Sequence, residues 1–325
     1  MSFYKGALPV DEIRHILDLR LAPLAEETIP LTEALGRVAA CPVVASNDLP
    51  DFDKSAMDGY AVHAEDLSGG VLEPAGECLI GQTMDVKLTP GMTIYVSTGA
   101  PVPLDAAAVV PVEESRVFDG AVVVGESTEG KHIIRRGERL KVGQIVVDAG
   151  AKIDLAKITL LASQRVEQVS VFKLPTVSFF ATGDELSESP HRFEVIDAIT
   201  PAVQAWCLAL GLELASCGHL PDNATEIEKA LREATADLVI TSGGASVGRK
   251  DFTRQAVASL AEIIVPGICI KPGSPAFIAI RDRQTYLGLP GNPNAAAHQL
   301  ELLGGMILKG LTGSEDFSPR EARGF

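Results

Sequence analysis

The hydrophobic and polar positions follow different patterns along the chain. Apolar residues recur at helical spacing over residues 10–25 and 33–40, which predicts two short helices. From about residue 41 to 147, short apolar stretches are broken by Gly and Pro, which is typical of a small β-rich domain. The strands expected there are Met92-Thr-Ile-Tyr-Val96, residues 107–112 and residues 121–124.

A different pattern begins at Pro175, where apolar strands alternate with amphipathic helices. This order predicts a doubly wound, mostly parallel α/β sheet. The expected strands are 176–181, 213–217, 238–241, 277–280 and 285–289, and the expected helices are 201–210, 224–236, 253–262 and 294–308. A helix over 154–163 and a strand over 169–172 precede them.

These patterns predict a multidomain α/β plus β protein. We expect an elongated linking and dimerisation domain formed by residues 1–45 and 140–174. A β-rich domain covers 46–139, the α/β domain covers 175–312, and residues 313–325 form a tail.

Composition narrows the class of protein. With 325 residues, 46% of them hydrophobic, the chain can bury several cores. A net charge of −15 disfavours binding to nucleic acids or anionic membranes. No apolar run is long enough for a membrane span or a signal peptide, so we expect a cytoplasmic protein. The five scattered cysteines form no C-x-x-C pair, which argues against disulfides or a zinc knuckle and predicts buried apolar thiols.

Three polar turns directly follow expected strands: Ala181-Thr-Gly-Asp-Glu185, Thr241-Ser-Gly-Gly-Ala-Ser-Val-Gly248 and Leu289-Pro-Gly-Asn-Pro293. The last of them supplies an Asn cap and a proline suited to the start of a helix. Ligands of parallel α/β sheets bind beyond the carboxyl ends of the strands, so these turns predict a binding site. The glycine turn would offer backbone N–H groups to a phosphate, although close strand–helix packing also explains such glycines. Arg249-Lys250 excludes an ATP-binding P-loop. The candidate binding residues are Thr182, Gly243, Gly244, Ser246, Gly248, Pro290, Gly291, Asn292 and Pro293.

Charged side chains near these turns are candidates for phosphate and cation chemistry. Glu185 and Asp251 could hold a divalent cation such as Mg²⁺ beside a bound phosphate. Asp222 either joins them or only starts the helix at Ala224. Lys271, between turn-forming residues, either contacts the phosphate or is a solvated turn lysine.

A series of motifs resembles the molybdopterin molybdenumtransferase family over nearly the whole chain. The matching segments are 51–62, 97–103, 134–138, 181–186, 241–248 with Asp251, 270–273 and 288–293. The α/β motifs are shared with molybdopterin adenylyltransferases. Ser55-Ala-Met-Asp-Gly-Tyr60 and the Ser97-Thr-Gly-Ala-Pro-Val-Pro103 segment separate the two families.

The resemblance implies an elongated homodimer that uses adenylylated molybdopterin and molybdate, cleaves the adenylate with Mg²⁺, and releases AMP. It assigns catalysis to Asp58, Glu185, Asp222 and Asp251, and metal binding to Glu185 and Asp251. Thr98 and Lys271 join the residues of the three turns in ligand binding, and Asp58 and Thr98 would reach the partner subunit's cleft. A molybdopterin adenylyltransferase and a recipient molybdoenzyme are candidate protein partners.

The chain departs from the family pattern at several positions. Arg139, Ser274 and Ile199 stand where most members have Asp, Lys and Asn, and the sequence ends at Phe325, where members continue into a small β domain. Two alternatives to the insertion enzyme are therefore a non-catalytic molybdopterin-binding carrier or regulator, and a different adenylate-cleaving reaction on a related pterin. Molybdate and tungstate are both tetrahedral oxyanions, and the motifs do not choose between them.

Overall fold

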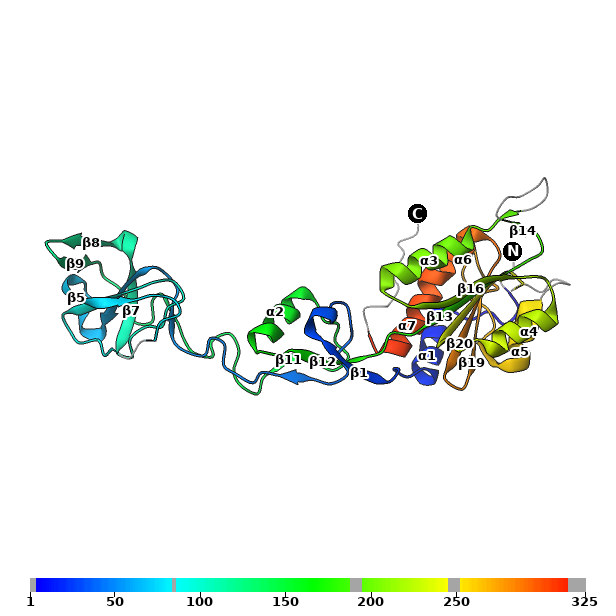
Figure 1. Cartoon of the computed structure of the whole chain (residues 1–325), viewed down its shortest axis with the longest axis horizontal. Coiled ribbons are helices and arrows are strands. Elements are labelled where there is room, and N and C mark those ends of the chain that lie inside the picture. The colour runs from blue at the N-terminus through cyan, green and yellow to red at the C-terminus, as the bar shows by residue number, and fades with distance from the viewer. Residues whose placement is uncertain (1–3, 84–85, 188–194, 245–251, 315–325) are drawn as a thin grey trace. The chain divides into compact units, whose positions relative to one another are not determined.

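The computed structural model describes residues 4–83, 86–187, 195–244 and 252–314. Two compact units can be distinguished in it (Figure 1). The α/β unit comprises Met1–Cys41, Asp148–Ile158 and Glu167–Phe325, and the β-rich unit comprises Pro42–Val147 and Thr159–Val166. The finer division with a separate linking domain stays a prediction.

A six-stranded sheet forms the centre of the α/β unit, in the order β16-β13-β17-β20-β19-β18. The first four strands pair in parallel, whereas β19 pairs antiparallel with both of its neighbours. The strands are β13 Val177–Thr182, β16 Leu214–Leu220, β17 Leu238–Ser242, β18 Glu262–Val265, β19 Phe277–Arg281 and β20 Gln284–Leu289. The predicted α/β character is confirmed, but the periodicity missed β18, which lies where the sequence suggested the end of a helix.

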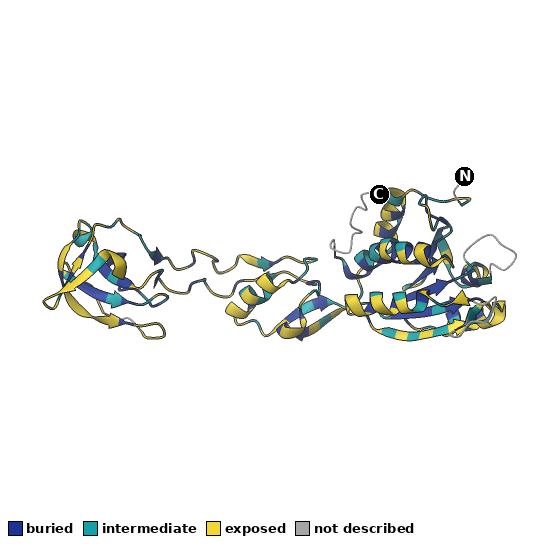
Figure 2. Cartoon of the chain, turned by 90° about the horizontal axis from the view of Figure 1, so that it is seen from above, coloured by how far each residue is buried: buried dark blue, intermediate teal, exposed yellow. Residues whose placement is uncertain are grey.

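Helices cover both faces of this sheet, so its strands are buried on both sides (Figure 2). One core lies between the sheet and α1, α3 and α7, and the other between the sheet and α4 and α5. The helices are α1 Val10–Arg20, α3 Ile199–Leu210, α4 Ala224–Glu233, α5 Phe252–Leu260, α6 Pro293–Gln299 and α7 Gly305–Thr312, with a π-helical segment Leu300–Gly304 before α7.

The N-terminal segments differ from their predicted form. The first helix ends at Arg20 instead of residue 25, because the chain becomes extended at Leu21 and then forms β1, Glu26–Pro30, which pairs with β12, Gln168–Phe172. The helix predicted over 33–40 is wrong. Only a short 3₁₀ turn, Leu31–Glu33, forms there, and the backbone beyond Gly36, whose φ is 79°, pairs with residues 151–153 and Ser170 instead.

A second six-stranded sheet, in the order β7-β4-β6-β5-β9-β8, forms most of the β-rich unit. Its strands are β4 Gly59–His63, β5 Gly70–Cys78, β6 Met92–Val96, β7 Ala106–Pro111, β8 Ser115–Phe118 and β9 Ala121–Val124. The expected strands at β6, β7 and β9 are confirmed. β4, β5 and β8 were not among the expected strands; in β5, Gly, Pro and Glu interrupt the apolar positions.

Short elements complete the chain. The two-stranded pairs are β2 Val43–Val44 with β11 Ile145–Val147, β3 Lys54–Ser55 with β10 Ile133–Ile134, and β14 Leu186–Ser187 with β15 Val195–Ile196. The remaining helical elements are α2 Leu155–Ser163 and the 3₁₀ turns Ala64–Asp66 and Val112–Glu114. None of the helices in the described ranges has the length and apolarity needed to cross a bilayer.

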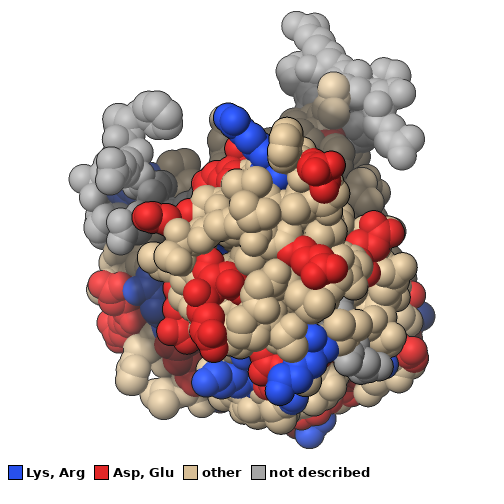
Figure 3. All heavy atoms as spheres, turned by 90° about the vertical axis from the view of Figure 1, so that its left-hand side faces the viewer, with Lys and Arg blue, Asp and Glu red and all other residues tan. Residues whose placement is uncertain are grey.

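The charge of the β-rich unit is uneven. Between Gly59 and Glu126 the sequence has ten Asp or Glu residues and two Lys or Arg residues. Figure 3 shows acidic side chains spread among uncharged ones over one face of the molecule. This unit therefore presents a negative potential to its surroundings.

The expectation of buried thiols is only partly right. All five cysteines are free; Cys78 and Cys207 are buried, whereas Cys41 and Cys217 are exposed. Burial, with a smaller contribution from Cys217, raises the pKa of the Cys207 thiol to about 11.

We predict that Gly288→Ala destabilises the α/β unit. A Cβ atom at Gly288 would lie 2.0 Å from Cε1 of the fully buried Phe277. Such overpacking costs about 1–3 kcal/mol in the free energy of unfolding. Urea unfolding followed through the fluorescence of Trp206, the single tryptophan of the chain, measures this loss.

Gly218→Ala is the matched control, because Gly218 lies in the same sheet with no atom within 4 Å of the added Cβ position. We expect its free energy of unfolding to stay within about 0.5 kcal/mol of the original. Equal effects of the two substitutions would contradict the packing argument.

Candidate functional site

The ends of four parallel strands meet at one edge of the α/β sheet. Thr182 pairs with Leu220, and Ser242 pairs with both Ala181 and Leu289. The turns that follow β13, β17 and β20 therefore start side by side, although they are far apart in the sequence. This edge is where ligands of parallel sheets bind.

Backbone atoms of these turns approach one another closely. Gly243 has a φ of 88°, and a Cβ atom there would lie 2.3 Å from the carbonyl oxygen of Thr182. Gly291 approaches from the third turn, with its Cβ position 3.6 Å from the Cα atom of Gly243. A side chain at Gly243 would push these turns apart, so glycine is required at this position.

Buried hydroxyl groups form hydrogen bonds that hold the same turns in place. Thr182 is 3% exposed, and its hydroxyl donates to the carbonyl oxygen of Ser242 over 3.0 Å. It also lies 3.1 Å from the hydroxyl of Thr253, at the start of α5. Gly244 is in contact with Thr253, since a Cβ at Gly244 would lie 2.6 Å from its Oγ1 atom. The side chain of Thr182 thus maintains the turn rather than facing outward.

The turn after β13 carries the exposed carboxylate of Glu185. This carboxylate folds over Gly183, which has a φ of 143° and leaves room for it. The neighbouring Asp184 accepts a hydrogen bond from the backbone N–H of Asp222 over 3.0 Å. His219 donates from Nε2 to the carbonyl oxygen of Gly183 over 2.7 Å. Glu185 and Asp222 therefore lie on two loops that hydrogen bonds hold together.

The third turn begins α6 as its sequence predicts. Asn292 occupies the N-cap, where its Oδ1 atom accepts a hydrogen bond from the N–H of Ala295 over 3.1 Å. Pro293 is the first helical residue, a position at which proline loses no hydrogen bond. These two contacts fix the path of Pro290 and Gly291 past the end of β20.

Lys271 lies in a loop at the same edge of the sheet. Phe277, the first residue of β19, pairs with Gly288 near the end of β20, so the preceding loop lies next to the third turn. Gln299 of α6 is fully buried and donates to the carbonyl oxygen of Pro272 over 3.1 Å. The Lys271 side chain is exposed.

Two of the departures from the family pattern have structural roles here. Ser274 is buried, and its hydroxyl oxygen accepts a hydrogen bond from the backbone N–H of Tyr4 over 2.9 Å. Ile199 is buried in the core at the start of α3, where the carboxylate of Asp197 accepts its N–H and that of Thr200, both over 3.0 Å. Neither Ser274 nor Ile199 therefore presents its side chain to a ligand.

Three predicted site residues, Ser246, Gly248 and Asp251, lie outside the described residues. Within the ranges that are described, no group of three His, Cys, Asp or Glu residues could hold a metal ion. The predicted pairing of Glu185 with Asp251 in metal binding thus stays a prediction.

The β-rich unit brings the predicted residues Asp58 and Thr98 together. Asp58 precedes β4 and Thr98 follows β6, which pairs with it. Thr98 donates its backbone N–H over 2.6 Å and its hydroxyl over 2.8 Å to Oδ1 of Asp58. These two hydrogen bonds, led by that of the backbone N–H, lower the pKa of the Asp58 carboxyl. Asp58 is therefore an exposed carboxylate held in one orientation.

A second charged cluster in the β-rich unit joins the family-like segments 51–62 and 134–138, although none of its residues was predicted as a site residue. Arg135 donates to Asp53 over 2.6 Å, and the backbone N–H of Arg136 donates to the other carboxylate oxygen over 2.7 Å. Burial raises the pKa of Asp53, but these two hydrogen bonds outweigh it and lower the pKa overall. Asp53 lies within the family-like segment 51–62, but the sequence does not show which residues its side chain contacts. Arg139 is exposed, and its N–H donates to a backbone carbonyl.

Comparison with known proteins gives matches over both units. Residues 8–164 match the MoeA N-terminal region (domain I and II), and residues 178–309 match a probable molybdopterin binding domain. A molybdopterin molybdenumtransferase of Haemophilus influenzae is 34% identical over 298 residues, which cover 89% of this chain and 74% of that protein. One of a Nostoc species is 33% identical over 285 residues, covering 83% and 65% respectively.

Solved structures agree with these matches. A molybdopterin biosynthesis MoeA protein of Pyrococcus horikoshii superimposes with a TM-score of 0.81 at 25% sequence identity. The match covers 96% of this chain and 81% of that one.

We predict that Thr98→Ala raises the pKa of Asp58 but leaves it below the ordinary aspartate value, because the backbone N–H still donates. A carboxyl whose pKa is lowered in the folded protein stabilises the folded state at pH values above its ordinary pKa. This stabilisation is lost as the pH falls through the lowered pKa. A carbon-detected NMR titration of the Asp58 carboxyl measures the change.

Ser97→Ala is the control, since the Ser97 hydroxyl accepts from the N–H of Ile80 and does not contact Asp58. It should leave the Asp58 titration unchanged. If Thr98→Ala also left it unchanged, the hydroxyl would have no part in holding the carboxylate.

Proposed function

The chain belongs to the molybdopterin molybdenumtransferase family, and we propose that it acts in molybdenum cofactor biosynthesis by inserting molybdate into adenylylated molybdopterin with release of AMP. The observation that carries the proposal is the convergence of three turns at one edge of the α/β sheet. Each of these turns contains a motif of the family, and they meet through the glycines Gly243 and Gly291.

Phosphate binding would use backbone groups and one cation. Gly243 and Gly244 leave their N–H groups uncovered by side chains, which suits a phosphate that must approach the backbone. The exposed Lys271 would offset the charge of the phosphates. The turn from Pro290 to Pro293, fixed by the Asn292 cap, would border the pterin. Local groups must provide this attraction, since the net charge of the chain is −15.

Mg²⁺ fits the chemistry of the carboxylates at this edge. It commonly binds one or two carboxylates together with phosphate oxygens of the substrate. Glu185, exposed above Gly183, would supply one such ligand, and Asp251 would supply a second. The ion would neutralise charge that develops on the phosphate oxygens as the anhydride is cleaved.

Cleavage of the adenylate is a hydrolysis. A water oxygen forms a bond to phosphorus, the phosphoanhydride P–O bond breaks, and AMP leaves. The proton of the water passes to a carboxylate, for which Asp222 and Asp58 are the candidates. Asp222 lies on the loop tied to Asp184. Hydrogen bonds from Thr98 hold Asp58 in one orientation and keep it charged, although they also lower its affinity for a proton.

We further propose that the protein acts as a homodimer in which Asp58 and Thr98 of one subunit complete the site of the other. Asp58 and Thr98 belong to the β-rich unit and the three turns belong to the α/β unit, and the family resemblance implies that such residues of one subunit reach the cleft of its partner. Candidate protein partners are a molybdopterin adenylyltransferase, which would supply the substrate, and a recipient molybdoenzyme.

We predict that Glu185→Gln lowers the rate of AMP release by a factor on the order of 10² with limited loss of binding, because an uncharged amide is a poor ligand for Mg²⁺. The purified protein is incubated with adenylylated molybdopterin, Mg²⁺ and either molybdate or tungstate. AMP and the metal retained on the pterin are then quantified.

Glu213→Gln is the matched control, because Glu213 is an exposed glutamate just before β16, at the opposite edge of the sheet. It should release AMP at the original rate. Tight pterin binding without AMP release by the unmodified protein would contradict the proposal and identify a carrier or regulator instead.

A shared site also predicts complementation between two inactive variants. Asp58→Ala and Glu185→Gln subunits that are mixed after reversible dissociation should recover about a quarter of the original activity, since half of the dimers are mixed and carry one intact site. Light scattering checks that dimers form. A monomer, or no recovery in confirmed mixed dimers, would rule out the shared site.

A further inference from the structure

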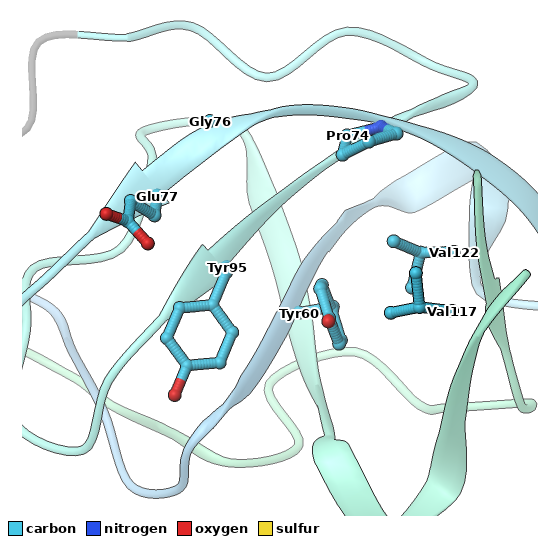
Figure 4. Close-up of a pocket in the computed structure, with 7 residues that line it drawn as sticks. All are labelled: Tyr60, Pro74, Gly76, Glu77, Tyr95, Val117 and Val122. Carbon is cyan, nitrogen blue, oxygen red and sulfur yellow. The ribbon is translucent and has the colours of Figure 1, made fainter. Parts of the chain in front are cut away.

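A groove of ≈ 610 Å³ opens on the β-rich unit, and none of the residues of the three turns lines it. Its floor consists of Tyr60 and Tyr95, with Glu77 at one end and Val117 and Val122 at the other (Figure 4). The lining is thus aromatic and aliphatic, with one carboxylate.

Strand register places the polar and aromatic residues of the groove in one row. Tyr60 of β4 lies opposite Tyr95 of β6, and Tyr95 lies beside Glu77 of β5. Residues paired across adjacent strands point to the same face of a sheet. The two rings meet edge to face, with centroids 5.7 Å apart and an angle of 70° between their planes. Tyr60 also packs against the buried cluster that includes Val62 and Val110, so the floor is anchored in the core.

A β-bulge leaves the groove open. The register of β5 against β6 shifts between Pro74 and Glu77. Gly76 within the bulge has a φ of 140°, and no atom lies within 4 Å of the position a Cβ would take. A bulge bends its strand, and a glycine there adds no side chain to fill the hollow. The space above the tyrosine rings is therefore a consequence of the backbone.

One wall of the groove is the outer strand of the sheet. β8 is the last strand in the order, so one side of its backbone has no partner strand within the sheet. Val117 of β8 pairs with the buried Val122 but is itself 67% exposed. An edge strand beside an apolar groove suits the binding of an extended peptide, which can pair with the free edge.

The charge around the groove favours a cation. Within the described part of the chain, Glu77 has no Lys or Arg as an ion-pair partner. Burial raises the pKa of the Tyr95 hydroxyl, and Asp58, Tyr60 and Glu77 raise it further. The ten acidic and two basic residues between Gly59 and Glu126 extend this negative potential over the sheet.

We propose that this groove is a docking site for an extended, arginine-bearing segment of a partner protein. The guanidinium group stacks on the ring of Tyr95, with Tyr60 at its side, and pairs with Glu77, while the backbone of the segment runs along the free edge of β8. Arginine fits better than lysine because its planar group stacks on an aromatic face and forms two parallel hydrogen bonds with a carboxylate.

The test is a titration of the full-length protein with an acetylated and amidated Val-Arg-Val-Arg-Val peptide. The protein carries 3-fluorotyrosine at its four tyrosines, and fluorine NMR follows each one. Tyr60→Phe and Tyr95→Phe assign two of the signals. We expect saturable shifts of the Tyr60 and Tyr95 signals, with the signals of Tyr4 and Tyr286 unchanged.

Two controls isolate the charge. The same peptide with citrulline, which is uncharged and similar in shape, should bind more weakly. Glu77→Gln should weaken binding of the arginine peptide by about two- to fivefold, the range measured for exposed ion pairs. Glu73→Gln removes the same charge from an exposed position of β5 that does not line the groove, and it should leave binding unchanged. Dispersed Tyr60 and Tyr95 signals in the absence of peptide verify that the β-rich unit of each variant is folded.

Several outcomes would overturn the proposal. Equal binding of the citrulline peptide would show that the groove does not recognise a cation. Equal weakening by Glu73→Gln and Glu77→Gln would show non-specific attraction to an acidic surface. Absence of any shift at Tyr60 and Tyr95 would exclude the groove as the docking site.

Discussion

The close approach of three backbone turns at one edge of the α/β sheet is the constraint on which the candidate site depends. Parallel pairing brings the ends of β13, β17 and β20 to the same edge, and Gly243 lets the second turn lie against the carbonyl of Thr182. Any side chain at this glycine would separate the turns by more than the tolerance of a close-packed interior. The exposed groups of the site are positioned by contacts that are themselves buried.

At this edge, buried polar groups bond to the backbone, whereas exposed polar groups face outward. The hydroxyl of Thr182 and the amide of Gln299 are inside and bond to backbone carbonyls, while Glu185 and Lys271 face outward. Ser274 belongs to the first group, because its hydroxyl anchors the backbone of Tyr4. The family resemblance places a lysine at this position in most members, whereas here the serine is part of the framework, so the proposed charge neutralisation at this edge would depend more heavily on Lys271.

In the β-rich unit, one pair of strands carries both the Asp58–Thr98 contact and the tyrosine floor of the groove. β4 and β6 pair from Gly59 to Val62, with Asp58 and Thr98 just beyond one end of this pairing and Tyr60 and Tyr95 within it. The same acidic surroundings act on both places. A carboxylate held by hydrogen bonds stays charged there, whereas a cation arriving from outside is attracted.

The sequence by itself determined the family, the alternation of strands and helices after Pro175, and the Asn292 cap, because these depend on local spacing and on residue types with strong conformational preferences. It failed over 33–40, where helical spacing gave way to long-range pairing with residues 151–153. Only the tertiary structure decided which polar side chains face inward, as those of Ser274 and Thr182 do. It also decided that Asp53 accepts a hydrogen bond from Arg135, 82 positions away in the sequence. The physical reason is that burial and hydrogen-bond partners arise from residues distant in sequence, so no local pattern records them.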